Sequence, residues 1–193
     1  VAKYTVTAND GATITVNGAE VASPAQVAYD TKVSVHKDGA EAWKLNDGTV
    51  VGYGDTYTFF CGSDIELTPV MTAVQQKTTV KILSATPIEG TVKVSFLATR
   101  NVAPGETVVK QGFVYGKNLA DSELTLDNVG NKGADANAGT VKILYNKNSA
   151  EQIALDYGLS KKDGKISAVA FVITKTADGT LKPTMSNIES YTY

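Results

Sequence analysis

The chain has 193 residues with a formal net charge of −2, and its 42% hydrophobic and 20% charged residues exclude an intrinsically disordered protein. Lysine and arginine form no cluster, so the basic surface that nucleic-acid binding requires is missing and we expect no nucleic-acid partner. No apolar stretch approaches the about 20 residues that a membrane-spanning helix needs, so we expect no direct membrane insertion by this chain.

Short runs of alternating polar and apolar residues fill the amino-terminal part of the chain. In one of them, residues 31–36, two valines share one face, which is typical of a half-buried strand. Asn17-Gly18 follows another run and supplies the positive φ angles of a two-residue hairpin turn. Further runs lie at residues 42–45, 50–53, 56–60 and 64–71, and the first three are separated by turns at Asn46-Asp47-Gly48 and Gly54-Asp55. We therefore expect a small β domain over residues 1–73.

Residues 74–79 are polar and show no alternation, so we interpret them as a linker. Strand patterns then resume, at residues 78–83, 91–100, 107–116, 140–146, 165–176 and 180–193. Gly112 interrupts the third of these runs, which indicates either a pair of strands or one strand with a bulge at this glycine. The run at 165–176 is the most apolar and predicts a central strand. We expect a second β domain over residues 80–193.

Two segments of this second domain depart from the strand pattern. Residues 130–139 are small and polar with nothing to bury, which predicts a mobile loop. Residues 149–158 show a helical period instead, because Ser149 can cap a helix, Ile153 and Tyr157 lie four residues apart, and a glycine can end it. We expect one short helix of about two turns there.

Longer stretches of the chain carry a family resemblance. Residues 42–70, AWKLNDGTVVGYGDTYTFFCGSDIELTPV, resemble the small β repeats of bacterial surface proteins, in which a Trp-containing strand, an Asn/Asp-Gly turn and a Tyr-Thr-Phe strand recur. Residues 91–116 and 165–190 resemble the closing module of large cell-surface proteins from gut Firmicutes, an immunoglobulin-like or fibronectin-type-III-like sandwich. The resemblance implies a mainly β fold of two small β domains in tandem, the second an immunoglobulin-like sandwich. It also implies an extracellular location, secreted or at the bacterial cell surface, and it brings no catalytic motif.

The chain offers few groups for catalysis. Nucleophilic catalysis needs an imidazole or an equivalent base beside the nucleophile, and the one histidine, His36, lies on the polar face of its predicted strand. Zinc sites usually need three or four protein ligands, which the same scarcity disfavours. The one cysteine, Cys61, is interpreted as a small apolar filler at a strand end. We expect no enzyme, no metal and no cofactor.

Carboxylate and amide side chains are more numerous and could support three further kinds of chemistry. Calcium could bind to a loop with five suitable side chains, Asp121, Glu123, Asp127, Asn128 and Asn131, although the EF-hand spacing is absent. Glycosidase chemistry needs two facing carboxylates, and most of the available acids occupy turns or exposed positions: Glu66, Glu89, Glu106 and Glu151. An isopeptide crosslink between Lys81 and Asn187 would join the first and last strands of the second domain, although we expect Lys81 to face water.

Three aromatic residues of the first domain, Trp43, Tyr53 and Tyr57, lie close in the sequence and could stack on sugar rings. Alternatively, Trp43 shares a strand face with Leu45 and belongs to the core. Our leading hypothesis is a non-catalytic structural or adhesive module, acting as a spacer or assembly domain with protein neighbours at the cell surface. The second hypothesis is a carbohydrate-binding module with a glycan as its partner, and the third is a hydrolase with unrecognised carboxylates.

Overall fold

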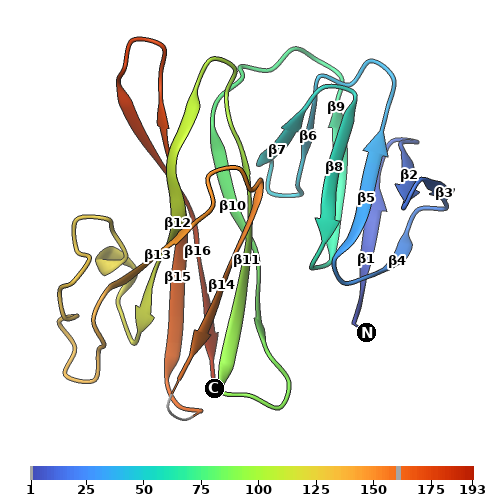
Figure 1. Cartoon of the computed structure of the whole chain (residues 1–193). Helices are drawn as coiled ribbons and strands as arrows, with labels where there is room; N and C mark the ends of the chain where they lie inside the picture. The colour runs from blue at the N-terminus through green and yellow to red at the C-terminus, as the bar shows by residue number, and fades with distance from the viewer. Residues whose placement is uncertain (1, 160–161) are drawn as a thin grey trace. The chain divides into compact units, whose positions relative to one another are not determined.

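The computed structural model describes residues 2–159 and 162–193 and is mainly β, as predicted (Figure 1). The chain divides into two compact units, residues 1–79 and residues 80–193. The segment interpreted as a linker, residues 74–79, lies at the end of the first unit. Each unit has its own sheets and its own buried cluster of hydrophobic residues.

The described residues of the first unit form two sheets. The five-stranded sheet contains, in spatial order, β4 (Ala25–Ala28), β1 (Lys3–Ala8), β9 (Ile65–Val70), β6 (Ala42–Lys44) and β7 (Val50–Tyr53). The four-stranded sheet contains β3 (Ala19–Val21), β2 (Thr13–Val16), β5 (Thr31–His36) and β8 (Thr56–Cys61). The predicted hairpin is confirmed, because Asn17 and Gly18, with φ angles of 49° and 87°, join β2 to β3.

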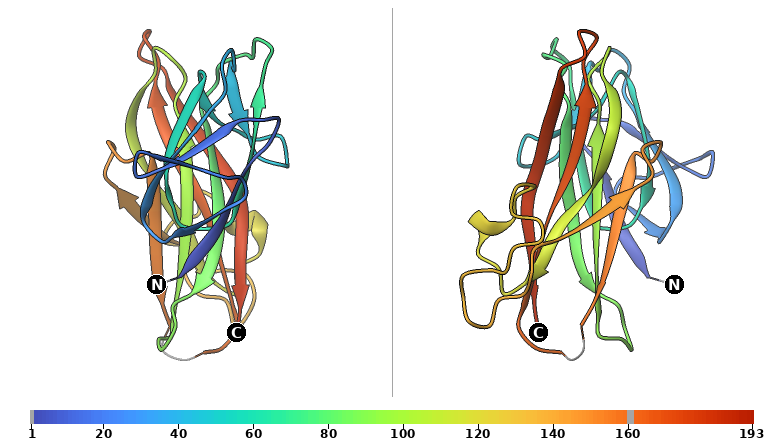
Figure 2. Two further views of the ribbon diagram at one scale, coloured as in Figure 1. Left: turned by 90° about the vertical axis from the view of Figure 1, so that its right-hand side faces the viewer. Right: turned by 60° about the vertical axis from the view of Figure 1, so that its left-hand side comes forward.

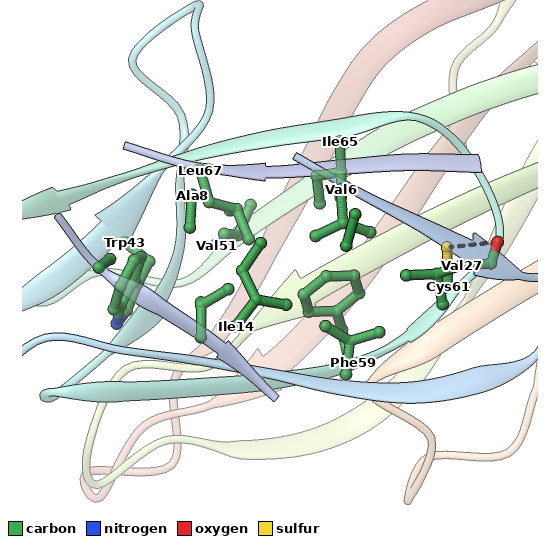
Figure 3. Packing of buried hydrophobic residues seen from close by; sticks show 14 residues of the cluster. Val6, Ala8, Ile14, Val27, Trp43, Val51, Phe59, Cys61, Ile65 and Leu67 are labelled. Atoms are coloured by element: carbon green, nitrogen blue, oxygen red, sulfur yellow. Dashed lines mark hydrogen bonds between the residues drawn. The ribbon is translucent and has the colours of Figure 1, made fainter. Parts of the chain in front are cut away.

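Alternating residues from both of these sheets build the core of the first unit (Figure 3). Val33 and Val35 of β5 are fully buried, as their alternation predicted, and Ile65 and Leu67 of β9 face the same core. Burial of one such side chain contributes about 1.5–3 kcal/mol. Trp43 of β6 also lies in this core.

The described residues of the second unit form two further sheets. The three-stranded sheet contains β10 (Thr79–Pro87), β11 (Lys93–Asn101) and β14 (Gln152–Gly158). The four-stranded sheet contains, in spatial order, β13 (Lys142–Asn146), β12 (Thr107–Lys117), β15 (Lys165–Lys175) and β16 (Leu181–Thr192). Side chains from both sheets form one hydrophobic cluster, so the two sheets pack face to face as a sandwich.

Strand β15 is central, as its apolar composition predicted, because it pairs with β12 on one side and with β16 on the other. Its residues Ile166 and Val172 face the sandwich core, whereas Val169 and Phe171 face a second cluster on the outer side of the sheet. Burial of both faces explains why this strand is apolar throughout instead of alternating with polar residues.

A loop of residues 118–141, between β12 and β13, covers part of this outer side (Figure 2). The loop contains a short 3₁₀ helix, η1 (Asp121–Glu123). It contributes its own apolar side chains to the outer cluster, among them Leu119, Leu124, Ala138 and Val141. Long loops without regular structure are uncommon in compact domains, and this one is stabilised by its own small core.

The segment 130–139, predicted to have nothing to bury, is held by specific contacts within this loop. The carboxylate of Glu123 accepts hydrogen bonds from the backbone N–H groups of Ala120, at 2.8 Å, and Ala134, at 2.6 Å. Ala138 is 5% exposed, so the segment does bury an apolar side chain. The sequence pattern therefore missed both the acid that orders the loop and the residue that packs beneath it.

The predicted helix over residues 149–158 is wrong, because β14 occupies most of this segment and pairs antiparallel with β11. Ile153 and Tyr157 are four residues apart, a spacing that places two side chains on one face of a helix and equally on one face of a strand. Leu155 distinguishes the two, because it is buried beside Ile153 with the period of two that only a strand satisfies.

Gly112 lies in β12 for a reason other than the predicted bulge. The register of β12 against β15 shifts between Val108 and Lys110, so the irregularity lies before Gly112. At Gly112 the neighbouring strand β13 comes so close that a Cβ atom would lie 1.8 Å from the carbonyl oxygen of Leu144. The absence of a side chain at this position is what allows the two backbones to pair.

Candidate functional site

The three aromatic residues predicted as a sugar-binding platform do not form one exposed surface. Trp43 is 0% exposed and lies at one end of the buried cluster of the first unit (Figure 3). The ring of Tyr57 packs against the same core and stacks on Phe59, with the ring centroids 5.3 Å apart. It also lies over Gly52, where a Cβ atom would be 2.5 Å from the ring. The glycan hypothesis therefore draws no support from Trp43 or Tyr57.

Tyr53 instead fastens the end of the first unit. Its hydroxyl donates a hydrogen bond to the carbonyl oxygen of Lys77, at 3.0 Å, and accepts one from the N–H group of the same residue, at 2.9 Å. The hydroxyl of Thr79 donates to the carbonyl oxygen of Val50, at 2.7 Å. Both contacts attach the segment to β7, so part of the predicted linker is bound to the first unit.

His36 lies at the surface between two other polar side chains. Its Nδ1 atom is 2.9 Å from the hydroxyl of Thr56, and its Nε2 atom is 3.0 Å from the carboxylate of Asp38. This connectivity resembles nucleophile, base and orienting acid. However, the hydroxyl of Thr56 donates its proton to Asp55, at 3.0 Å, and the side chain of Asp38 is fully exposed. The arrangement is that of a hydrogen-bonded surface turn.

Cys61 ends β8 inside the core and is 1% exposed. Its Sγ atom lies 4.0 Å from the carbonyl oxygen of Val27 (Figure 3). It lies 3.9 Å from the carbonyl oxygen of Ser63. Burial raises the pKa of the thiol, which keeps it protonated and unreactive. These contacts are those of the small apolar filler that the sequence indicated.

Two of the three acidic side chains predicted as calcium ligands, Asp121 and Glu123, have other partners within the second unit. Asp121 lies 3.8 Å from the ammonium group of Lys165, and Glu123 binds backbone N–H groups of its own loop. The side-chain amide of Asn128 donates to the carbonyl oxygen of Glu123. Among the described residues, no group of three or more His, Cys, Asp or Glu side chains is gathered as a metal ion requires.

The four acids named for hydrolysis are divided between the units, with Glu66 in the first and the others in the second. The carboxylate of Glu106 is only 8% exposed and accepts hydrogen bonds from Thr174, at 2.7 Å, and Lys182, at 2.6 Å. It thereby ties the start of β12 to β15 and β16. The carboxylate of Glu66 accepts from Asn46, at 2.7 Å, which lowers its pKa.

Asn187 joins the last strand of the second unit, β16, to the first strand of the same unit, β10. The register of β16 against β15 shifts between Met185 and Ile188, which is a bulge. The Asn187 side chain accepts a hydrogen bond from the N–H group of Ile82 in β10, at 2.9 Å, and donates one to its carbonyl oxygen, at 3.4 Å. The amide also donates to Glu189, at 2.7 Å. The isopeptide crosslink through Asn187 stays a prediction.

The first and last strands of the first unit, β1 and β9, are parallel neighbours. Around this terminal strand pair, side chains add hydrogen bonds to those of the backbone. Asp64 accepts from the N–H group of Thr5, at 2.7 Å. The Asn9 amide donates to Glu66, at 2.9 Å, and to Thr68, at 3.0 Å. The middle of β1 is therefore bonded to the residue before β9, and the residue after β1 is bonded to β9 itself.

Comparison with protein-family models, curated proteins and solved structures returned no match to the chain. No helix in the described part of the chain is long and apolar enough to cross a bilayer. The function must therefore be argued from the strands and their contacts.

The sequence did not indicate the residues that join the terminal strands of each unit. Asn9 precedes an Asp-Gly dipeptide, a position typical of a turn, although its side chain bonds to β9. For Asn187 the sequence suggested only a crosslink, although its amide binds the backbone of β10. An isolated asparagine beside an alternating run is the only local signal, and it does not reveal which strand lies opposite.

Proposed function

We propose that the chain is a non-enzymatic structural module of a secreted or cell-surface bacterial protein, in which it acts as a spacer that bears tension. The sequence resemblance supports the location. The use of polar side chains supports the role, because Asn9, Glu106, Gln111 and Asn187 all fasten strands or loops to one another. A buried polar group that is fully bonded helps to specify one rigid arrangement.

A fibronectin-type-III-like or immunoglobulin-like sandwich is our proposal for the second unit. Of its seven strands in chain order, the first, second and fifth (β10, β11 and β14) form one sheet. The third, fourth, sixth and seventh (β12, β13, β15 and β16) form the opposite sheet. The fourth strand, β13, lies beside β12, whereas the fourth strand of immunoglobulin constant domains joins the other sheet. This placement favours the fibronectin-like form.

The observation that carries the tension-bearing role is the terminal strand pair of the first unit. Tension applied to the two ends of this unit pulls the start of β1 and the end of β9 in opposite directions along their common axis. Because these strands are parallel, the bonds between them are loaded together in shear instead of opening one at a time. In the second unit, the Asn187–Ile82 contacts similarly join the first and last strands.

Single-molecule stretching of the full chain between two handles tests this proposal. We expect two separate unfolding steps that release about 26–28 nm of chain for the 79 residues of the first unit and about 38–41 nm for the 114 residues of the second. Forced unfolding reports the unfolding rate, so the loaded bonds determine the force of each step.

Two variants distinguish this role from general stability. N9A should lower the force of the shorter step and N187A that of the longer step, each leaving the other step unchanged. N137A, in an exposed loop outside both strand contacts, serves as the control. Unfolding of the wild-type first unit at forces too small to resolve, or equal effects of N9A and N137A, would contradict the proposal.

A further inference from the structure

The outer side of the four-stranded sheet in the second unit is covered over one half only. The loop 118–141 packs on Val114, Val169 and their neighbours. Beyond it, the strands present a more exposed surface, here called the open face. It consists of the outward residues Lys110, Tyr145, Lys175, Leu181, Pro183 and Met185, and the partly buried Ile173 lies where it meets the outer cluster. Their outward direction follows from strand alternation. Val169 and Phe171 of β15 face the outer cluster, so every second residue of β15 and the residues paired with them point to the same side.

The open face is the most apolar part of the exposed surface of this unit. Tyr145 is 55% exposed, Leu181 57% and Met185 37%, and Val109 of the neighbouring bulge is 36% exposed. These are all of the large hydrophobic residues found exposed among the described residues 80–159 and 162–193. Single exposed apolar residues are ordinary, but their concentration on one face indicates an interaction surface.

The charge of the open face is positive. Lys110 and Lys175 are exposed there, and Lys110 lies over the ring of Tyr145, 5.3 Å from its centroid. None of the outward positions on β12, β13, β15 or β16 carries an acid. The nearest turn carries Asp178, whose carboxylate accepts hydrogen bonds from Thr176 and Thr180. A surface that fits the open face should therefore combine carboxylates with apolar side chains.

The first unit combines an excess of carboxylates with exposed apolar side chains. It carries five lysines against nine Asp and Glu residues, a formal charge of −4, whereas the second unit carries 13 basic and 11 acidic residues, a formal charge of +2. The first unit also exposes large apolar side chains, among them Tyr29 at 57% and Phe60 at 50%. The two units of one chain are thus complementary in charge, and both expose apolar residues.

The β16 edge of this four-stranded sheet is unsuited to pairing with another strand. Pro183 removes one backbone donor from β16, and the bulge near Asn187 interrupts its edge. A partner on the β16 side would therefore pack on the open face rather than extend the sheet there.

We propose that the open face binds the acidic first unit of a second copy of the chain, head to tail. Such a contact joins two different surfaces, so repetition builds a ring where the rotation between copies closes and a linear assembly where it does not. The inference rests on the proposed structural role and adds the partner. Its failure would leave the stretching experiment unaffected, because that experiment examines single chains.

Analytical ultracentrifugation of the full chain tests self-association. We expect the average mass to rise between about 10 µM and about 1 mM, a range suited to weak contacts, and to fall when the salt concentration is raised from about 0.05 M to about 0.5 M. K110E/K175E should weaken association by about tenfold or more. The matched control K93E/K132E makes the same change of net charge at two exposed lysines that are not part of the open face and should leave association unchanged.

The apolar part of the contact is tested by L181S/M185S, which leaves all charges in place and should also weaken association. Carbodiimide crosslinking of a mixture of ¹⁴N- and ¹⁵N-labelled chains then identifies the partner surface. Mixed-isotope links from Lys110 or Lys175 to carboxylates of the first unit support the proposal. A monomer at all concentrations, links within one chain only, links between two second units, or equal effects of K110E/K175E and K93E/K132E would each overturn it.

Discussion

Single residues in this protein are explained by the backbone or side chain that lies opposite them. Gln111 is fully buried, and its amide accepts from Arg100, at 2.6 Å, and donates to the carbonyl oxygen of Ala150, at 2.8 Å. A glutamine in the centre of an apolar strand looks misplaced in the sequence. It is stable there because each of its polar atoms has a partner.

Gly112 gives the sharpest prediction for a single residue. G112A places a methyl group where 1.8 Å separates it from the carbonyl oxygen of Leu144, so β12 and β13 must move apart. We expect the free energy of unfolding to fall by about 1–3 kcal/mol, the usual cost of overpacking, as measured by urea denaturation. G158A is the control, because a Cβ atom there meets nothing closer than 3.6 Å. Equal stability of G112A and the wild type would contradict the close approach.

Among the secondary-structure elements, alternation predicted most strands and their buried faces, because a strand with one solvated face has a period that the sequence displays directly. It predicted a helix where β14 lies, because the spacing of Ile153 and Tyr157 satisfies both periods. The partner of each strand was not predictable. The parallel pairing of β1 with β9 joins segments that are about 60 residues apart, and no local signal encodes it.

The terminal strand pair also gives a prediction about pH. Hydrogen bonds from Asn46 and Asn9 lower the pKa of Glu66 in the folded state. A lowered pKa means that the stabilisation is present above the pKa of glutamate in the unfolded chain and is lost as the pH falls through the folded value. We expect N46A, and to a smaller extent N9A, to raise the pKa of Glu66 toward its ordinary value in an NMR titration. An unchanged titration curve in both variants would contradict these contacts.

At the scale of the whole molecule, the chain has separate hydrophobic cores in its two units. Trp43, the only tryptophan, lies in the first core, so its fluorescence reports on that unit alone. We expect the denaturant transition followed by fluorescence to differ from that followed by far-UV circular dichroism, which reports on both units. Coincident transitions by both methods would show that the chain unfolds as one cooperative body.

The sequence by itself determined that this chain is mainly β, which residues face the cores and where several of the turns lie, because these properties depend on residues that are near one another in the chain. Only the tertiary structure decided what lies opposite each strand. It buried Trp43, left Leu181 and Tyr145 exposed on one face, and placed Asn9 and Asn187 between terminal strands. Such contacts join distant segments, so their geometry arises only when the sheets have assembled.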